Sequence, residues 1–350
     1  MEKMKALVVK GPYDAEITEV DKPVAKDDYI VIKVKKVGLC ATDMAIFDGS
    51  TSFVKDGQIK YPVRIGHEWS GIVESVGDKV KGFKAGDRVF SDCAVTCGKC
   101  DACKAGNKSG CTDVRSLGTV HTWDGCYAEY MYIPERNLYH LSDNVSFDEG
   151  ALIEPTCISY DAFTDYKLSK DDTVVVFGTG AIGLGAVWLA KYFGVKKVII
   201  VGRNTNKLEK ALKIGADDYI NAKEKDAASA ILSMTGGKGA DLIIEATGSE
   251  AAFIQSLQAV KAHGRISILS FYDKLLSNIP LDQAVLKCVH IRGGAGCFDY
   301  PAVVHKIMSE YDVKISNVIS HHVKFADCLD CFYHPEKYAK EKTKIIIDFD

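Results

Sequence analysis

Four closely spaced cysteines form the densest group of potential metal ligands in the chain. They are Cys97, Cys100, Cys103 and Cys111, in the segment CGKCDACKAGNKSGC. Four thiolates at this spacing can surround one tetrahedral ion, and four sulfur ligands leave no open position, which is typical of structural zinc. The alternatives are an iron–sulfur cluster, for which the ferredoxin spacing that ends in Cys-Pro is missing, or a set of exposed reactive thiols. We expect a structural zinc ion that fixes the shape of a lobe at residues 97–111.

A second set of potential ligands is dispersed along the chain. It comprises Cys40 in GLCATD, His67 and Glu68 in IGHEWSG, and Glu154 in ALIEPT. Each residue alone is more often structural, because buried cysteine is common and a single histidine is usually a hydrogen-bonded core residue. Together they offer a sulfur, an imidazole and carboxylates, a mixed set that suits zinc with an exchangeable position. Pro155 disfavours helix at the residue before it, so we expect Glu154 on an extended connector between the two halves of the chain.

The segment 173–204 has the sequence of a dinucleotide-binding unit. A β-branched run ends at Phe177, a Gly-x-Gly-x-x-Gly turn and an apolar helical stretch follow, and a second β-branched strand covers Lys197–Val201. The three glycines would form a tight turn, give the pyrophosphate access to the backbone and allow close packing of helix on strand. The helix N-terminus offers free N–H groups and a partial positive charge to the phosphates. The predicted cofactor-binding positions here are Gly178, Gly180, Ala181, Ile182 and Gly183.

The end of the second strand indicates which nucleotide is bound. NAD-binding units place an acidic residue about 20 positions after the glycine turn, where it accepts hydrogen bonds from the ribose hydroxyls. This chain has Gly202 and Arg203 there, and no Asp or Glu occurs between Gly194 and Lys207. A glycine leaves room for a 2′-phosphate, and a guanidinium can pair with it through two hydrogen bonds. We therefore predict a preference for NADP(H); the alternative is that Arg203 is solvated and NAD(H) binds through its ribose alone.

The elements that must position these residues differ between the two halves of the chain. Residues 1–150 are rich in short β-prone runs broken by Gly, Pro, Asp and Asn, which predicts an antiparallel, strand-rich half. The expected strands are Lys5–Val9, Tyr29–Val37, Gly71–Val76, Asp87–Phe90 and Tyr127–Ile133.

The rest of the chain alternates between helical and β-prone segments. Helices are expected at 225–235 and 250–260, and the strands near Asp218–Ile220, Asp241–Ile244, Arg265–Leu269 and Val289–Arg292. This alternation predicts a doubly wound parallel sheet. Ligands of such sheets bind at the carboxyl ends of the strands, so Thr247, directly after one of them, is a further candidate cofactor contact.

The composition excludes several classes of function. With 350 residues the chain is long enough for two domains with sizeable cores. Charged residues make up 26%, hydrophobic residues 47%, and the net charge is −3, so neither disorder nor a general attraction to nucleic acid or anionic membrane is expected. The N-terminus has too short an apolar run for a signal peptide, which indicates a cytoplasmic protein. The twelve cysteines then favour thiolates and metal over disulfides.

Taken in order, these motifs resemble the zinc-containing medium-chain alcohol dehydrogenase superfamily. The matching positions are Gly66-His67-Glu68, Gly71, Gly77, Val80, Cys40, Thr42-Asp43, the four-cysteine lobe, Gly86-Asp87-Arg88-Val89 and the glycine turn. Glu154-Pro155 is similar to the polyol branch, which includes sorbitol and galactitol-phosphate dehydrogenases, where other alcohol dehydrogenases have a second cysteine. The resemblance implies an α/β chain with a β-rich, GroES-like catalytic domain at 1–155, a Rossmann nucleotide-binding domain at 156–290, and a C-terminal segment at 291–350 that returns to the first domain.

The resemblance also implies a reaction and roles for individual residues. A zinc-dependent enzyme would transfer hydride between NAD(P) and a secondary alcohol of a polyol, a sugar alcohol or its phosphate. A Lewis-acidic zinc lowers the pKa of a bound oxygen, which makes the alkoxide accessible near neutral pH. Cys40, His67 and Glu68 or Glu154 would hold this catalytic zinc, and one carboxylate could act through bound water. Thr42 would hydrogen-bond the substrate oxygen and begin a proton relay, although without the resemblance it could equally cap a turn.

One departure from the family pattern concerns the exit of the proton. Many relatives have a histidine five residues after the catalytic cysteine, whereas this chain has Ala45. Water, a ribose hydroxyl or Glu154 would have to take its place.

The resemblance further implies two Zn²⁺ per subunit, a small polyol or ketose substrate, and a homotetramer or homodimer. An amino-alcohol dehydrogenase resembling threonine 3-dehydrogenase is the first alternative. A non-enzymatic nucleotide-binding protein is the second, but it would be expected to have lost catalytic ligands, all of which are present.

The sequence does not decide the role of two lysines, and it predicts a structural role for the remaining cysteines. Lys55 and Lys60, in the polar segment Ser50–Lys60, could contact a phosphate on a sugar substrate or could simply be solvated. The cysteines outside the two metal-ligand sets are expected to be core thiols; they are Cys93, Cys126, Cys157, Cys288, Cys297, Cys328 and Cys331.

Overall fold

The chain folds into two compact units, each built around its own sheet. The structure is a computed structural model that describes residues 2–294 and 300–349. The first unit comprises Met1–Glu154, Cys297–Glu310 and Ile319–Asp350, and the second comprises Pro155–Gly296 and Tyr311–Val318. Among the helices of the described residues, none combines the length and the apolar character that crossing a membrane requires.

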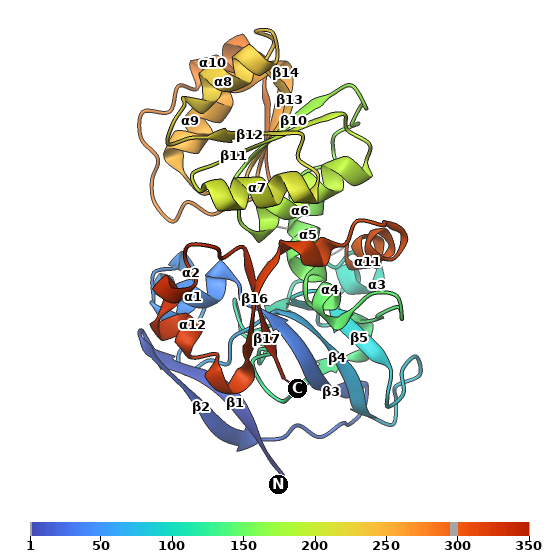
Figure 1. Ribbon diagram of the computed structural model, residues 1–350. Coiled ribbons are helices and arrows are strands. Elements are labelled where there is room, and N and C mark those ends of the chain that lie inside the picture. Colours follow the sequence, from blue (N-terminus) through green and yellow to red (C-terminus); the bar gives the residue numbers. More distant parts are fainter. Residues whose placement is uncertain (1, 295–299, 350) are drawn as a thin grey trace. The chain divides into compact units, whose positions relative to one another are not determined.

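A seven-stranded sheet forms the framework of the first unit. Its strands are β3 (Tyr29–Gly38), β4 (Glu68–Val76), β5 (Arg88–Ser91), β8 (Tyr130–Pro134), β9 (Leu138–His140), β16 (Ile319–Lys324) and β17 (Lys344–Asp348). The order is β16-β17-β3-β4-β5-β9, and β8 also pairs with β3. β17 pairs antiparallel with β3 and parallel with β16, so strands from the two ends of the chain lie side by side (Figure 1). The C-terminal strands thereby complete the sheet that begins near the N-terminus.

The core of the first unit lies against this sheet. Residues of β3 such as Ile30, Ile32 and Val34 are almost fully buried and pack with Trp69 and Tyr127. The other strands of the unit are β1 (Lys3–Gly11) and β2 (Asp14–Asp21), which form a hairpin, and the short pair β6 (Ala94–Val95) and β7 (Arg115–Ser116). Its helices are α1 (Ala41–Phe47), α2 (Ser52–Lys55), α3 (Asp101–Lys104), η1 (Glu135–Asn137), α4 (Phe147–Ala151), α11 (Pro301–Glu310), η3 (Phe325–Asp327), α12 (Asp330–Tyr333) and η4 (Pro335–Lys337).

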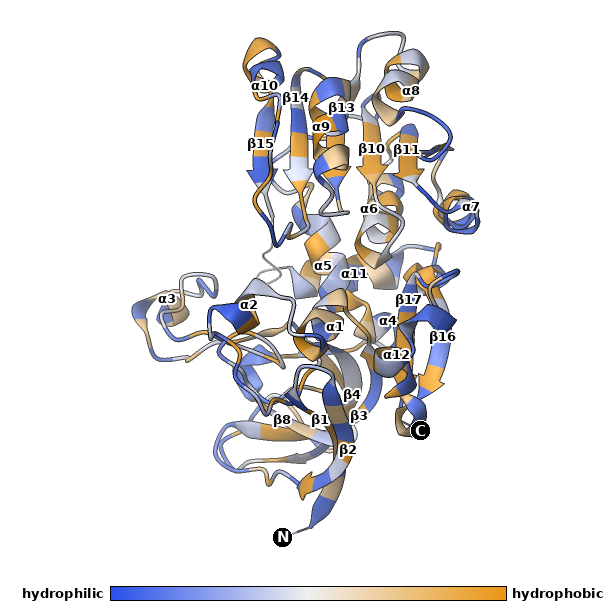
Figure 2. Ribbon diagram, turned by 90° about the vertical axis from the view of Figure 1, so that its left-hand side faces the viewer, coloured by the Kyte–Doolittle hydropathy of each residue, from blue (hydrophilic) through white to orange (hydrophobic). Residues whose placement is uncertain are grey.

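A six-stranded parallel sheet forms the second unit. Its strands are β10 (Thr173–Phe177), β11 (Lys197–Gly202), β12 (Asp218–Asn221), β13 (Ala240–Glu245), β14 (Val260–Ile268) and β15 (His290–Gly293), in the order β12-β11-β10-β13-β14-β15. Helices cover both faces, so the central strands are hydrophobic along most of their length, as Figure 2 shows for β10 and β11. The helices are α5 (Ile153–Asp161, which begins in the first unit), α6 (Ala181–Tyr192), α7 (Thr205–Ile214), α8 (Ala227–Met234), α9 (Glu250–Ala259), α10 (Asp282–Leu286) and η2 (Ile315–Val318).

This architecture confirms the predicted α/β class, with a β-rich unit and a doubly wound parallel sheet. The strand order reverses between β10 and β13, where the chain crosses from one side of the sheet to the other. Such a switch point is where open α/β sheets bind nucleotides. The glycine turn directly follows β10 and therefore lies at this point.

Candidate metal and nucleotide sites

The four-cysteine lobe brings its sulfur atoms into one group. The Sγ atoms of Cys97, Cys100, Cys103 and Cys111 all lie within 4.8 Å of one another. The Cys103 N–H donates a hydrogen bond to the Sγ of Cys100 at 3.4 Å. Backbone N–H groups of Cys103 and Thr112 lower the pKa of the Cys100 thiol to about 6, which favours the thiolate that a metal ion binds. The described cysteines form no disulfide, and this donor set fits one tetrahedral Zn²⁺.

A lysine attaches the lobe to the sheet. Lys108 lies between the third and fourth cysteines; its Nζ is 3.4 Å from Asp92 Oδ2 and donates a hydrogen bond to the Tyr139 hydroxyl at 2.5 Å. Asp92 directly follows β5, and its burial raises its pKa to about 7, although Lys108 acts in the opposite direction. Since Tyr139 belongs to β9, the lobe is anchored at two neighbouring strands.

The dispersed residues Cys40, His67 and Glu68 converge in the first unit. Cys40 is the N-cap of α1, two residues after the end of β3, and Glu68 is the first residue of β4. The two strands pair antiparallel, with Gly38 opposite Glu68. One ligand atom from each of the three residues lies within 4.8 Å of the others. Strand pairing is therefore what brings together residues that are distant in the sequence.

The imidazole of His67 lies among negative groups. Its Nδ1 is 3.7 Å from Asp43 Oδ1, and neither of these buried atoms has a hydrogen-bond partner among the described residues. Burial acts to lower the pKa of His67, but Cys40, Asp43 and Glu154 outweigh this effect and raise the pKa well above its usual value. A carboxylate behind a histidine nitrogen is a common support of a metal-binding imidazole. The surplus of negative charge and the mixed sulfur, nitrogen and oxygen donors fit a zinc ion.

Glu68 is held by a buried lysine at the start of β17. The Lys344 Nζ donates hydrogen bonds to Glu68 Oε1 at 2.8 Å, to Glu68 Oε2 at 2.6 Å and to the Leu39 carbonyl oxygen at 3.1 Å. The two charged side chains are only 4% and 1% exposed. A Cβ at Gly38 would lie 2.1 Å from Glu68 Oε2, so the close approach of this carboxylate requires glycine there. Lys344 is not predicted from the sequence, where its only signal is a lysine that begins the apolar run KIIID.

Glu154 lies in a helix, so the expected extended connector is wrong. Both Glu154 and Pro155 occupy the first turn of α5. Proline is tolerated there because the N–H that it lacks would have no partner within the helix. The Glu154 side chain is buried, and burial raises its pKa, whereas His67 and Cys93 act to lower it. Its carboxylate thus interacts with the His67 group without belonging to the close set of three.

Thr42 lies in the first turn of α1 and is half-buried. The capping role considered for it belongs instead to Asp43, whose Oδ2 accepts a hydrogen bond from the Cys40 N–H at 3.0 Å. Ala45, in the same helix, carries no group that could transfer a proton.

The three glycines of the nucleotide turn have different surroundings. Gly178 has φ 118°, in the region that favours glycine. A Cβ at Gly180, the N-cap of α6, would meet nothing within 4 Å, whereas one at Gly183 would lie 2.0 Å from the Gly178 carbonyl oxygen. The first glycine therefore makes the turn, the second leaves the backbone accessible, and the third permits close packing of α6 on β10. Ala181 and Ile182 supply the unpaired N–H groups of the first turn.

Two cations follow the second strand of the nucleotide unit. Gly202 ends β11, and the exposed Arg203 comes next. Lys207, which is not predicted from the sequence, lies half-buried in the first turn of α7, and its burial lowers its pKa. Within the described residues, neither cation forms an ion pair. A Cβ at Gly202 would lie 2.5 Å from the Thr179 Cγ2, so this glycine also serves packing on the turn.

Thr247, directly beyond β13, is bound to a buried carboxylate. Its hydroxyl donates a hydrogen bond to Glu245 Oε1, and its N–H donates to the same oxygen at 2.8 Å. The Tyr272 hydroxyl donates to Glu245 Oε2 at 2.8 Å. Glu245, which the sequence analysis did not single out, thus fixes the loop at the carboxyl end of the sheet.

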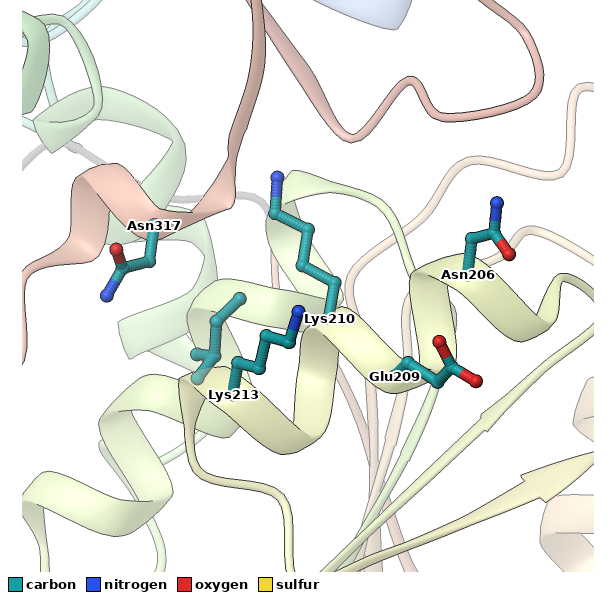
Figure 3. Close-up of a pocket in the computed structure, with 6 residues that line it drawn as sticks. Asn206, Glu209, Lys210, Lys213 and Asn317 are labelled. Atoms are coloured by element: carbon teal, nitrogen blue, oxygen red, sulfur yellow. The ribbon is translucent and has the colours of Figure 1, made fainter.

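A pocket on the second unit lies between α7 and η2 (Figure 3). It has a volume of about 450 Å³ and is lined by Asn206, Glu209, Lys210, Lys213, Ile214 and Asn317. Lys210 is partly engaged, because its Nζ donates a hydrogen bond to the Val318 carbonyl oxygen at 3.2 Å. None of the glycines of the nucleotide turn lines this pocket, so we assign it no part in nucleotide binding.

The remaining cysteines are mostly, but not all, core thiols. Cys328 and Cys331 are buried, and burial raises the pKa of both thiols, which disfavours the thiolate that redox chemistry requires. Cys288 is exposed, so the expectation of a core thiol is wrong for it; it has φ 50° in the turn between α10 and β15, which carries it out of the packed layer. Cys297 lies outside the described residues.

Comparison with known proteins identifies the family. Residues 26–143 match the alcohol dehydrogenase GroES-like domain, and residues 181–310 match the zinc-binding dehydrogenase family. The chain is 34% identical to the sorbitol dehydrogenase of Bacillus subtilis (strain 168) over 279 residues, which is 80% of this chain and 78% of that protein. It is 32% identical to an L-threonine 3-dehydrogenase of Chromobacterium violaceum over 352 residues, 99% of this chain and 100% of the other.

Solved structures agree with this family. A putative zinc-binding dehydrogenase from Sinorhizobium meliloti bound to NADP has a TM-score of 0.90 at 25% identity and covers 99% of this chain and 100% of its own. An alcohol dehydrogenase from E. coli complexed with NADH has a TM-score of 0.88 at 28% identity, with 100% of both chains covered. The chain belongs to the zinc-containing medium-chain alcohol dehydrogenase family. The prediction of a zinc- and NAD(P)-dependent oxidoreductase of this family is thereby confirmed.

Proposed function

We propose that this chain interconverts a secondary alcohol of a polyol or sugar alcohol and the corresponding ketone, with NADP(H) as the coenzyme. The observation that carries this proposal is the convergence of Cys40, His67 and Glu68 in a buried, negatively charged group, in a chain that also has a dinucleotide turn. The similarity to a sorbitol dehydrogenase supports the polyol class. We assign the reaction centre to the first unit and coenzyme binding to the second.

Two zinc ions per chain form part of this proposal. The four cysteines would hold the structural ion. Cys40, His67 and one carboxylate would hold the catalytic ion, which supplies Lewis acidity to an alcohol oxygen. Both carboxylate oxygens of Glu68 are bonded to Lys344, so we assign the third protein ligand to Glu154. Glu68 and Lys344 would then be positioning residues for the segment that carries Cys40.

Thr42 is the proposed hydrogen-bond partner of the substrate hydroxyl. It lies two residues after Cys40 on α1, and Asp43 rather than Thr42 caps the helix. A threonine hydroxyl can accept a hydrogen bond from the substrate O–H and at the same time donate a hydrogen bond from its own O–H to the next acceptor. Because Ala45 cannot continue this path and Glu154 is assigned to the metal ion, the next acceptor would be water or a ribose hydroxyl.

The preference for NADP(H) rests on two cations and the missing carboxylate. Arg203 and Lys207 follow the strand end at which an NAD-binding unit has its acidic residue. A 2′-phosphate carries a charge of about −1.5 to −2 and would be attracted to both cations.

The oligomer that we propose pairs two copies through the edge of the parallel sheet. β15 is the outer strand of this sheet, beside β14 (Figure 2). Close to it in the chain are large apolar side chains that are strongly exposed: Leu275 (97%), Val285 (74%) and Leu286 (80%). An open strand edge with exposed apolar side chains close to it in the chain is suited to a second copy of the same surface.

The experiment that tests the function is a substrate panel with both coenzymes. Sorbitol, other polyols, their phosphates and L-threonine would be assayed with NADP⁺ and with NAD⁺ on zinc-loaded protein. We expect turnover of a polyol or its phosphate, with a higher kcat/KM for NADP⁺. Turnover of L-threonine alone would replace the proposal with the amino-alcohol alternative, which the similarity to threonine 3-dehydrogenases keeps open.

A further inference from the structure

A second pocket, on the first unit, has a positively charged lining. It has a volume of about 700 Å³, and its lining includes Lys60, Thr112, Arg115, His121 and Thr122. The metal-ligand candidates do not line it. Asp113 is the one acidic residue among the described residues that do, so the two cations Lys60 and Arg115 outnumber the single carboxylate.

Neither cation of this pocket has an ion-pair partner among the described residues, and the guanidinium of Arg115 is also oriented. The Arg115 Nε donates a hydrogen bond to the His121 carbonyl oxygen at 3.1 Å, and its guanidinium lies 5.7 Å from the Trp123 ring centre. These contacts fix the plane of the guanidinium and leave its terminal Nη groups without a hydrogen bond among the described residues. Lys60 is exposed and, within the same residues, has no ion-pair partner. Such a free, oriented fork is suited to a phosphate or carboxylate.

Two loops meet at this pocket through the backbone of His121. Its N–H donates a hydrogen bond to the Gln58 carbonyl oxygen at 3.1 Å, which joins the segment that carries Lys60 to the loop that carries Arg115. His121 has φ 50°, a conformation that is uncommon for a residue with a Cβ. The loop is thus held in a strained conformation where it presents its charged side chains.

The opposite side of this loop packs next to the candidate metal ligands. A Cβ at Gly118 would lie 2.4 Å from the Gly66 backbone nitrogen, and Gly66 directly precedes His67. The Leu117 N–H donates a hydrogen bond to the Cys93 carbonyl oxygen at 2.8 Å. Leu117 is fully buried, whereas Arg115 and His121 are exposed. One loop therefore has an inner side against the proposed reaction centre and an outer side that lines the cationic pocket.

We propose that this pocket binds the phosphoryl group of a phosphorylated sugar-alcohol substrate. The inference rests on the proposed function and narrows its substrate class to phosphate esters. A phosphoryl group carries about −1.5 to −2 charges and several acceptor oxygens, which match two cations and the hydroxyl of Thr112. The other threonine of the lining, Thr122, donates its hydroxyl proton to the Thr119 carbonyl oxygen at 2.6 Å. The carboxylate of threonine is a poor match, because it is only two bonds from the carbon that would be oxidised and would stay at the inner side of the loop.

Charge-removing variants test the site directly. Lys60→Gln and Arg115→Gln would be compared with Lys55→Gln, which removes an exposed cation of the same segment that does not line the pocket. With saturating NADP⁺, each pocket variant should raise KM for sorbitol 6-phosphate about tenfold, in line with the loss of one charge-assisted hydrogen bond. KM for sorbitol, the KM for NADP⁺ and kcat should stay unchanged, as should all constants of Lys55→Gln. Lys60→Gln is the variant least affected by misfolding, because Lys60 is exposed and its side chain forms no hydrogen bond or ion pair among the described residues.

A binding measurement separates this inference from the function on which it rests. ³¹P line broadening of inorganic phosphate would be measured with the coenzyme-free wild type and with Lys60→Gln. Binding that weakens about tenfold in the variant supports the pocket even if no alcohol is oxidised, in which case the proposed function alone fails. Binding that is equal in both proteins, or an equal KM change for sorbitol and its phosphate, overturns the pocket assignment. If phosphate binds here but KM for sorbitol 6-phosphate does not change in either variant, the pocket takes free anions and the substrate assignment is wrong.

Discussion

The ammonium group of Lys344 donates three hydrogen bonds. Two go to the carboxylate oxygens of Glu68, and one goes to the carbonyl oxygen of Leu39, the residue that precedes Cys40. At the scale of single residues, this buried pair determines what Glu68 can do. A buried carboxylate without a partner is strongly unfavourable, so Lys344 is needed wherever Glu68 is charged. The pair joins three segments that are distant in sequence, which is why no local pattern revealed it.

Removal of the Lys344 charge alone should therefore destabilise the first unit more than removal of the Lys344 and Glu68 charges together. We expect Lys344→Met to lower the free energy of unfolding by about 3–5 kcal/mol, because it leaves Glu68 buried and unpaired. The double variant Glu68→Gln/Lys344→Met should recover a large part of that loss. Urea denaturation of the two single variants and the double variant measures this coupling. Simple additivity of the two single effects would show that the pair is not coupled.

Coenzyme choice is also decided by single residues. Arg203→Gln should raise KM for NADP⁺ by roughly 10- to 100-fold, because a charge-assisted hydrogen bond contributes about 1.5–3 kcal/mol. KM for NAD⁺ should change little. Lys213→Gln, which removes an exposed cation farther along α7, is the matched control. If the ratio of the KM values for NADP⁺ and NAD⁺ is the same in Arg203→Gln as in the wild type, the predicted preference for NADP(H) has no basis in this residue. Arg203 is a cleaner position than Gly202, where an added side chain would press on Thr179.

At the scale of elements, the sequence predicted those whose causes are local. The glycine turn, β10, β11 and the four-cysteine lobe follow from short spacings and β-branched runs, and the structure has all of them. It also has β17, which was missed because this strand is completed by pairing with β3, far away in the chain. The helical Glu154 was missed because a preference against helix before proline is weak, and α5 instead uses Pro155 in its first turn.

The two glycines at the start of α6 offer a matched test of that turn. Gly183→Ala should lower the free energy of unfolding by about 1–3 kcal/mol, because its Cβ would meet the Gly178 carbonyl oxygen. Gly180→Ala should leave stability almost unchanged but weaken coenzyme binding, since its Cβ points into open space where the pyrophosphate is expected. Thermal melts and coenzyme titration by nicotinamide fluorescence would separate the two effects. Equal loss of stability in both variants would contradict the separate roles.

At the scale of the whole molecule, the exposed apolar side chains near β15 are the feature that one chain alone does not explain. Isolated surface leucines are ordinary, but several beside an open strand edge expose the sheet to association. The homodimer or homotetramer implied by the family resemblance would cover them. The cytoplasmic location expected from the sequence stays a prediction.

A charge on this surface should dissociate the oligomer. Leu286 is 80% exposed in the single chain, so Leu286→Glu costs the isolated fold little, whereas it would bury two carboxylates against each other in a two-fold interface. Light scattering after gel filtration should give at least a dimer for the wild type and a smaller species for the variant. Leu212→Glu, at an exposed leucine of α7, should not change the mass. A monomeric wild type would refute this interface.

The central claim is that Cys40 and His67 hold a metal ion separate from that of the four cysteines. Metal analysis of zinc-loaded wild type and of Cys40→Ser tests it most directly, with Cys328→Ser, at a buried thiol outside both groups, as a control for the loss of a cysteine. The account predicts two zinc ions per chain in the wild type and in the control, and one in Cys40→Ser together with loss of alcohol oxidation. One zinc ion per chain in all three proteins, with activity unaffected by Cys40→Ser, would contradict it.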